Sequence, residues 1–352
     1  MKHKKHFALC LFTAILLLCS CKGSQSYSSL QFYAMNTIID VTVSQKDFDF
    51  SELENYVYQT EKLLSKTNPE SDIFRLNEDG VCELSDITAE LIRLSKLISN
   101  ETGGAFDICS GALSELWDIT SENPKIPSDA DIRKAVNLCG NDKLVLNGNT
   151  AVITETGAKA DLGAVAKGYC AEKCIEMLKA QGIENAMVSF GGNVAVTGSS
   201  QSNLSKGKTG WNIGIKNPDD TSDIIGYINL SDKVMAVSGD YERYFEKDCK
   251  RYCHIFDIST GFPASSGLRS AAVICENGAI ADALSTALFV MGAEKSLELY
   301  NSGLYSFEAV LISDNAEIFL TDGITDSFVK NPTAKNSYGQ KYIYKALSQL
   351  NI

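Results

Sequence analysis

The chain has 352 residues, a formal net charge of −12 and a hydrophobic fraction of 44%. This acidic balance argues against nucleic-acid binding, which requires a basic face. It does not argue against a phosphate ligand, because a bound metal ion can supply positive charge locally. The length and apolar content allow one large domain or two modest ones.

The N-terminal residues have the pattern of a targeting segment. A basic stretch, "MKHKKH", precedes an apolar run over residues 7–20, which is too short for a helix that crosses a bilayer core of about 30 Å. The pattern therefore predicts a signal peptide over residues 1–20. Leu18-Cys19-Ser20-Cys21 resembles a bacterial lipobox, so we expect a lipid on Cys21 and attachment to the cell membrane on its periplasmic side; an ordinary cleaved signal peptide is the alternative. The serine-rich residues 21–29 predict a tether.

Elements follow in chain order from hydrophobic periodicity. Helices are predicted over 50–67, over 85–106 with Ser85 or Asp86 as the cap, around 111–119 and 128–140, from the Gly163 turn to about 180, over 277–292 and over 294–303. Strands are predicted over 30–43, 143–155, 185–198, 211–218, 223–231, 233–245, 267–276 and 307–324. Because helices and hairpins mix without strict βαβ alternation, we expect an α+β fold.

The cysteines show no disulfide framework. Eight follow Cys21 without framework spacing, no CxxC occurs, and only His254 follows the histidines at positions 3 and 6. We therefore expect most of these cysteines to be small apolar core residues rather than disulfide partners or zinc ligands.

One predicted helix carries polar groups inside an apolar run. In "ADALSTALFVMG" (281–292), Asp282, Ser285 and Thr286 share one helix face. A carboxylate in such a helix is costly unless it is paired or bound to a cation. One carboxylate with hydroxyls suits Mg²⁺, which keeps few protein ligands. An internal hydrogen-bonded Asp-Ser-Thr cluster is the open alternative.

Other stretches indicate phosphate or backbone recognition. Asp161 and Lys167 flank a glycine turn at a helix start, where exposed N–H groups attract phosphate, although a helix cap and a surface lysine explain them equally. Gly191-Gly192-Asn193 allows close approach of a ligand to the backbone, or forms a tight turn. "SNLSKGKTG" (202–210) lacks the first glycine of a P-loop, so it predicts a surface loop.

The order of these stretches carries more information than each one alone. Along about residues 30–330 the chain presents Met35-Asn36-Thr37, "GGAFDI", "DLGAVAKGY", "SFGGNV", "SGDYERYF", "HIFDISTGFPA" and "ADALSTALFVMG". In sequence and order they resemble the FAD:protein FMN transferases of the ApbE family. The resemblance implies mixed, largely antiparallel sheets with packed helices, and an active site in a cleft between two lobes. It makes residues 30–330 the catalytic domain and leaves 331–352 as a C-terminal segment.

The resemblance also implies the chemistry. FAD binds with Mg²⁺, a Thr or Ser hydroxyl of a target flavoprotein attacks the FMN-side phosphorus, and AMP leaves. We expect the target to be a membrane electron-transfer subunit. A Mg²⁺-dependent FAD pyrophosphatase and, in another class, a non-catalytic flavin-binding lipoprotein are the alternatives. Met35-Asn36-Thr37 departs from the usual Met-Gly-Thr, which adds a polar group at the pocket edge.

Site residues follow from the matched motifs. The implied metal ligands are the Ala164 carbonyl, Asp282 and Thr286, with Ser285 beside them. The implied flavin contacts are Met35, Ala105, Phe106, Asp107, Asp161, Lys167, Gly191, Gly192, Asn193, Ser238, Gly239, Tyr241, Arg243 and Phe256. His254 is the candidate general base, with Asp257 supporting it; a structural role for His254, or proton transfer to Asp257 instead, stays open.

Overall fold

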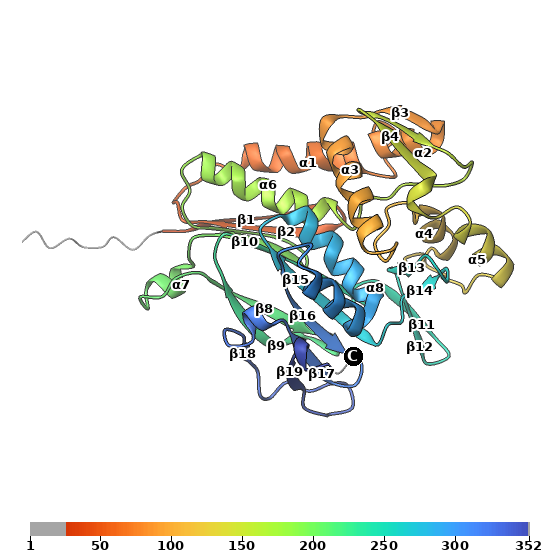
Figure 1. Ribbon diagram of the computed structural model, residues 1–352. Coiled ribbons are helices and arrows are strands. Elements are labelled where there is room, and N and C mark those ends of the chain that lie inside the picture. Colours follow the sequence, from red (N-terminus) through yellow and green to blue (C-terminus); the bar gives the residue numbers. More distant parts are fainter. Residues whose placement is uncertain (1–25, 351–352) are drawn as a thin grey trace, which may run out of the picture.

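The computed structural model describes residues 26–350 and is built on one large sheet with helices on one face (Figure 1). The predicted signal peptide, Cys21 and most of the tether lie outside the described residues. In spatial order the nine strands are β1 (Ser28–Ala34), β2 (Thr37–Val43), β6 (Ala186–Phe190), β7 (Asn193–Thr197), β10 (Lys233–Gly239), β15 (Leu268–Cys275), β16 (Glu308–Ser313), β17 (Glu317–Leu320) and β19 (Ile343–Ala346). All neighbouring pairs are antiparallel except β17 and β19, which confirms the expected α+β fold with a largely antiparallel sheet.

The large sheet separates two apolar layers. On β2, Ile39, Val41 and Val43 are fully buried on the helical side, and the residues between them point to the other face. The helical layer comprises α1 (Ser51–Leu64), α3 (Asp86–Glu101), α6 (Ala166–Ala180) and α8 (Gly278–Ser302). On the opposite face, a second buried cluster lies beneath a sheet of β18 (Val329–Lys330), β9 (Asp220–Leu230) and β8 (Trp211–Asn217).

A second group of elements lies at one end of the large sheet (Figure 1). It comprises α2 (Asp72–Asp79), β3 (Val81–Glu83), α4 (Gly111–Trp117), α5 (Asp129–Val136), β4 (Leu144–Asn147) and β5 (Thr150–Ile153). Two small hairpins adjoin it, β11 (Tyr244–Lys247) with β12 (Lys250–Cys253) and β13 (Phe256–Asp257) with β14 (Phe262–Pro263). Trp117 connects them, because its ring stacks on Tyr252 with centroids 5.7 Å apart and its Nε1 donates to the Gly261 carbonyl at 2.9 Å.

The predicted helices are all present, although several end earlier than expected, as α3 does at Glu101 and not at residue 106; α2 was not predicted. The Ser85 side chain caps α3 by accepting a hydrogen bond from the Thr88 N–H. Within α8, Gly292 has φ 80° and ψ 175°, which interrupts the helix where two separate helices were expected. The Gly-Lys-Thr stretch lies in exposed residues after the four-residue helix α7 (Gln201–Leu204), as expected for a loop without phosphate-binding geometry.

Two features were not predicted from the sequence. Strand β19 pairs in parallel with β17, so the C-terminal segment completes the edge of the main sheet. The β11–β12 hairpin has no glycine in its turn, where Asp248 and Cys249 adopt φ of 51° and 57°. The turn therefore has the aspartate of the usual Asp-Gly pair but not its glycine.

The cysteine prediction is confirmed. Among the described residues, seven of the eight free cysteines are buried and Cys249 is exposed. No helix within residues 26–350 is both long and apolar enough to cross a membrane.

Glycine allows α6 and α8 to approach closely, and this contact positions the candidate site. A Cβ added at Gly168 would lie 2.0 Å from the Gly278 carbonyl oxygen and 2.8 Å from Asp282 Cβ. We expect Gly168→Ala to lower the free energy of unfolding by about 1–3 kcal/mol, because the helices must move apart. Urea denaturation checks this expectation, and an unchanged midpoint and slope would contradict it.

Candidate functional site

Asp282 is buried at the contact between α8 and α6. It is 3% exposed, and its Oδ2 accepts a hydrogen bond of 3.0 Å from the Gly168 N–H. The Lys167 ammonium lies 3.8 Å from the same oxygen and donates to the Gly163 carbonyl at 2.7 Å. Among the described residues, no other group donates to this carboxylate. A buried carboxylate with so few partners is suited to binding a cation.

Three hydroxyl groups beside Asp282 form a chain with a defined direction. Ser285 Oγ donates its only proton to the backbone carbonyl of Asp282 at 2.8 Å. Ser238 Oγ lies 2.8 Å from Ser285 Oγ and 3.1 Å from Thr286 Oγ1. Ser238 therefore donates to Ser285, and Thr286 donates to Ser238, because each hydroxyl has one proton. This order leaves lone pairs of Thr286 available to a cation.

Removal of the central hydroxyl tests this chain. We expect Ser238→Ala to lower Mg²⁺ affinity about tenfold, because Thr286 then loses the acceptor that orients it. The measurement is the Mg²⁺ concentration that gives half-maximal stabilisation in thermal unfolding. Ser238→Thr keeps the hydroxyl and serves as the control; equal Mg²⁺ affinity in the alanine variant and the wild type would contradict the assigned direction.

Asp161 lies in the turn before α6 and pairs with a lysine that the motifs did not indicate. Lys66 Nζ donates to Asp161 Oδ2 at 2.6 Å, and the Gly163 N–H donates to Oδ1 at 2.9 Å. Burial opposes ionisation, but the positive charges of Lys66 and Lys167 and the hydrogen bonds outweigh it, so the pKa of Asp161 is lowered. Lys66 follows α1 and meets Asp161 only through the tertiary fold.

The segment Ala105-Phe106-Asp107 points mainly into the protein. Phe106 is 1% exposed and belongs to the main core. Asp107 accepts from Ser99 Oγ at 2.9 Å and from the Cys109 N–H at 2.7 Å, and burial raises its pKa. The Phe106 and Asp107 side chains therefore stabilise the loop that follows α3.

Two turns meet at the end of the large sheet. Met35 and Asn36 join β1 to β2 with φ of 51° and 57°, and the Met35 N–H donates to Glu61 Oε1 at 2.9 Å. A Cβ on Gly191 would lie 2.5 Å from Thr37 Oγ1, so only glycine allows the β6–β7 turn to come this close. Asn36 keeps the turn in spite of the departure from glycine, because asparagine tolerates positive φ.

Asn193 follows the Gly191-Gly192 turn and keeps a buried donor without a partner. The residue is 1% exposed, and its Oδ1 accepts from the Val237 N–H at 3.2 Å. Its Nδ2 has no hydrogen-bond partner. An unpaired buried amide costs stability unless a ligand or water pairs with it, so this atom supports a ligand at the turn.

His254 follows directly after β12 and is oriented by the backbone of Arg243. The backbone N–H of His254 donates to the Arg243 carbonyl at 3.1 Å, and the ring Nδ1 of His254 lies 3.3 Å from the same oxygen. A carbonyl only accepts, so the proton is on Nδ1 and Nε2 is free to act as a base. Burial and the positive charges of Arg243 and Lys167 lower the pKa of His254 to about 4. The ring is therefore neutral at physiological pH.

Asp257 does not contact this ring by hydrogen bonding. Its Oδ1 accepts from Ser259 N–H at 2.9 Å and from Ser259 Oγ at 2.6 Å, which closes the β13–β14 turn. Arg243, in turn, donates from Nη2 to the Asn36 carbonyl at 3.2 Å and so connects His254 to the β1–β2 turn.

Four further residues were predicted to belong to the site, namely Ala164, Gly239, Tyr241 and Phe256. Ala164 is half-buried in the turn before α6. Phe256 packs against Trp117 with ring centroids 6.3 Å apart, inside a small apolar cluster. Tyr241 Cε1 lies 2.5 Å from the position that a Cβ on Gly239 would take, which explains the glycine.

The donor set fits Mg²⁺. Asp282 supplies one carboxylate and Thr286 a directed hydroxyl, which leaves room for water and substrate oxygens, as Mg²⁺ prefers. No group of three or more His, Cys, Asp or Glu side chains that could hold a metal occurs within residues 26–350. The site thus differs from a zinc or calcium cage, which would need more such ligands.

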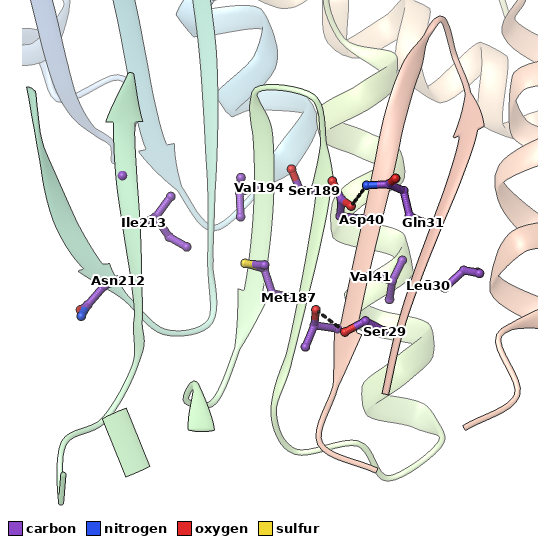
Figure 2. Close-up of a pocket in the computed structure, with 12 residues that line it drawn as sticks. Ser29, Leu30, Gln31, Asp40, Val41, Met187, Ser189, Val194, Asn212 and Ile213 are labelled. Atoms are coloured by element: carbon purple, nitrogen blue, oxygen red, sulfur yellow. Dashed lines mark hydrogen bonds between the residues drawn. The ribbon is translucent and has the colours of Figure 1, made fainter. Parts of the chain in front are cut away.

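A separate pocket lies on the opposite face of the large sheet (Figure 2). Gln31 Nε2 donates to Asp40 Oδ1 at 2.6 Å on one side of this pocket, and Asn212 and Ile213 of β8 line the other side. None of the predicted site residues lines it. It is therefore distinct from the candidate site.

The buried Asp282 carboxylate, the Lys167 ammonium, the unpaired Asn193 amide and the neutral His254 ring are together suited to the class of phosphoryl-transfer enzymes. Comparison with known proteins narrows this class. The model of the ApbE family matches residues 35–311. The FAD:protein FMN transferase of Treponema pallidum (strain Nichols) is 30% identical over 289 residues, which cover 78% of this chain and 80% of that protein. That of Klebsiella pneumoniae (strain 342) is 31% identical over 277 residues, 77% of this chain and 84% of that one.

Solved structures agree with the sequence comparison. The ApbE protein from Thermotoga maritima matches with a TM-score of 0.76 and 32% identity, over 86% of this chain and 99% of that chain. A flavin transferase ApbE from Vibrio cholerae matches with a TM-score of 0.73 and 25% identity, over 90% and 99% of the two chains. The chain belongs to the ApbE family.

Proposed function

We propose that this chain transfers FMN from FAD to a Thr or Ser hydroxyl of a target flavoprotein, with Mg²⁺ as cofactor and AMP as the second product. The observation that carries the proposal is the convergence of the buried Asp282 carboxylate, the directed Thr286 hydroxyl and Lys167 with a neutral His254, in a chain whose relatives are named FAD:protein FMN transferases.

Each residue has a role that its surroundings support. Asp282 and Thr286 would hold Mg²⁺, with the Ala164 carbonyl as a further ligand. When bound, the ion neutralises phosphate charge and polarises the phosphoryl oxygens. Lys167 and the unpaired Asn193 amide favour the anionic substrate at the start of α6 and at the β6–β7 turn.

The transfer step requires one base. The acceptor oxygen forms a bond to the FMN-side phosphorus, the bond from that phosphorus to the bridging oxygen breaks, and AMP leaves with the bridging oxygen. His254 Nε2 takes the hydroxyl proton, because Nδ1 is committed to the Arg243 carbonyl. Water at the position of the acceptor would give FMN and AMP instead, so a pyrophosphatase is the competing function of the same site. The polar Asn36 at the pocket edge is the reason to test for this pyrophosphatase activity.

The site of action is also a proposal. A lipid on Cys21 would hold the enzyme on the periplasmic side of the cell membrane, where a membrane electron-transfer subunit could present its acceptor residue. The lipobox and the polar tether support this arrangement.

The test uses the purified protein with FAD, Mg²⁺ and a purified acceptor protein of the Vibrio cholerae relative. We expect flavin fluorescence on the denatured acceptor and one AMP for each labelled molecule. AMP without labelled acceptor would identify a pyrophosphatase, and intact FAD retained without products would identify a binding protein.

A further inference from the structure

A second groove lies against the β11–β12 hairpin. It has a volume of about 760 Å³, within the range of about 300–1,000 Å³ that is usual for ligand clefts. We define the hairpin groove by six of its lining residues, Tyr244, Arg251, Phe262, Leu268, Arg269 and Tyr338. Aromatic side chains are accessible in it: Tyr244 is 41%, Phe262 36% and Tyr338 83% exposed.

The two guanidinium groups in the hairpin groove are already paired. Arg269 lies 2.7 Å from Asp240 and 2.7 Å from Asp219. Arg251 lies 3.2 Å from Asp240, and its guanidinium covers the Tyr244 ring at 4.2 Å from the centroid. Because both guanidinium groups are occupied, the groove suits a polypeptide better than a phosphate or a nucleotide.

The hairpin has an unpaired edge on each side. Strands β11 and β12 pair with each other and with no other strand among residues 26–350. Tyr252 stacks on both Phe245 and Trp117, and residues of both strands, Tyr252 included, line the groove. Exposed strand edges bind extended peptides through main-chain hydrogen bonds.

The hairpin also leads directly to the candidate active site. Strand β11 begins one residue after Arg243, and β12 ends one residue before His254. Tyr244 and Cys253 form the pair at its base, and both line the groove. Two lining residues, Tyr244 and Cys253, are therefore the direct chain neighbours of Arg243 and of the proposed base His254.

We propose that the hairpin groove binds an extended segment of the acceptor protein and directs its hydroxyl to His254. This inference rests on the proposed function, which requires a protein hydroxyl to reach the His254 ring. The occupant is then the acceptor and not FAD, because Lys167, Asp282 and Gly191 lie outside the groove lining. Aromatic contacts and a strand edge would supply affinity with little dependence on acceptor charge.

Two variants change the groove without touching the machinery. Tyr338→Ala removes an exposed anchor, and Ser337→Trp fills the groove from an exposed loop. We expect each to raise the KM for the Vibrio cholerae acceptor protein about tenfold, with kcat at saturating acceptor and the Kd for FAD unchanged. Matched controls are Tyr58→Ala on α1 and Ser205→Trp in an exposed loop elsewhere, which should keep the wild-type KM.

Each other outcome overturns the proposal. An unchanged KM in both groove variants would show that the acceptor binds elsewhere. A weakened Kd for FAD would make the groove part of the flavin site. If the wild type also leaves the acceptor unlabelled, the proposed function fails first, and that result is distinct from a groove variant that labels as well as wild type.

Discussion

Asp282→Asn should reduce the rate of FMN transfer about 10²–10³-fold. The substitution keeps the shape of the side chain and an acceptor for the Gly168 N–H, but it removes the negative charge that would hold Mg²⁺. Loss of one group that stabilises transition-state charge has an effect of this size. The measurement is AMP release with FAD and Mg²⁺ under saturating conditions.

A binding readout separates this role from a structural one. Mg²⁺ at a hundred times its Kd should stabilise the wild type by about 2.7 kcal/mol, and this stabilisation should disappear in Asp282→Asn. Asp232→Asn changes a carboxylate that pairs with Lys179 away from the site and should keep both activity and the Mg²⁺ response. Wild-type turnover in Asp282→Asn would show that Asp282 does not bind the metal.

His254→Ala should slow transfer by about 10²–10⁴-fold and leave the Kd for FAD within about threefold of wild type. The reason is that the imidazole accepts the acceptor proton but is not needed to hold the pyrophosphate. Added imidazole should restore part of the rate in the alanine variant. Equal loss of FAD binding and transfer would make His254 structural.

The pH dependence follows from the lowered pKa of His254. A pKa of about 4, compared with 6.5 for an ordinary histidine, means that the ring is neutral above that pH. As the pH falls, kcat/KM should therefore decline with a midpoint near 4 rather than near 6.5. His254 is the sole histidine after position 6, so its imidazole signal is unique in protein without residues 1–25. A proton NMR titration midpoint near 6.5 would contradict the expected burial and charge effects.

Periodicity predicted most of the fold because the elements are amphipathic and carry local end signals. Ser85 begins α3, Gly292 divides α8, and Gly191 turns β6 into β7, each through a property of the residue itself. The β11–β12 hairpin was less visible, since its turn pair Asp248-Cys249 lacks the glycine of the usual Asp-Gly signal.

The candidate site depended more on tertiary contacts. Asp282, Ser285 and Thr286 share a helix face that spacing alone predicts. Lys66 could not be found in this way, because it meets Asp161 across 95 positions of sequence. Asp257 stands three residues after His254, yet its carboxylate turns to Ser259 while the Arg243 carbonyl orients the ring. Sequence spacing shows which residues are near one another along the chain but not which atoms they face.

Crystals of the protein with FAD and Mn²⁺, whose anomalous scattering locates the ion, test the central assignment most directly. We expect one anomalous peak within coordination distance of both Asp282 and Thr286, in contact with the FAD phosphates. Bound FAD with no metal peak beside α8, or with the ion held by other residues, would contradict the assignment.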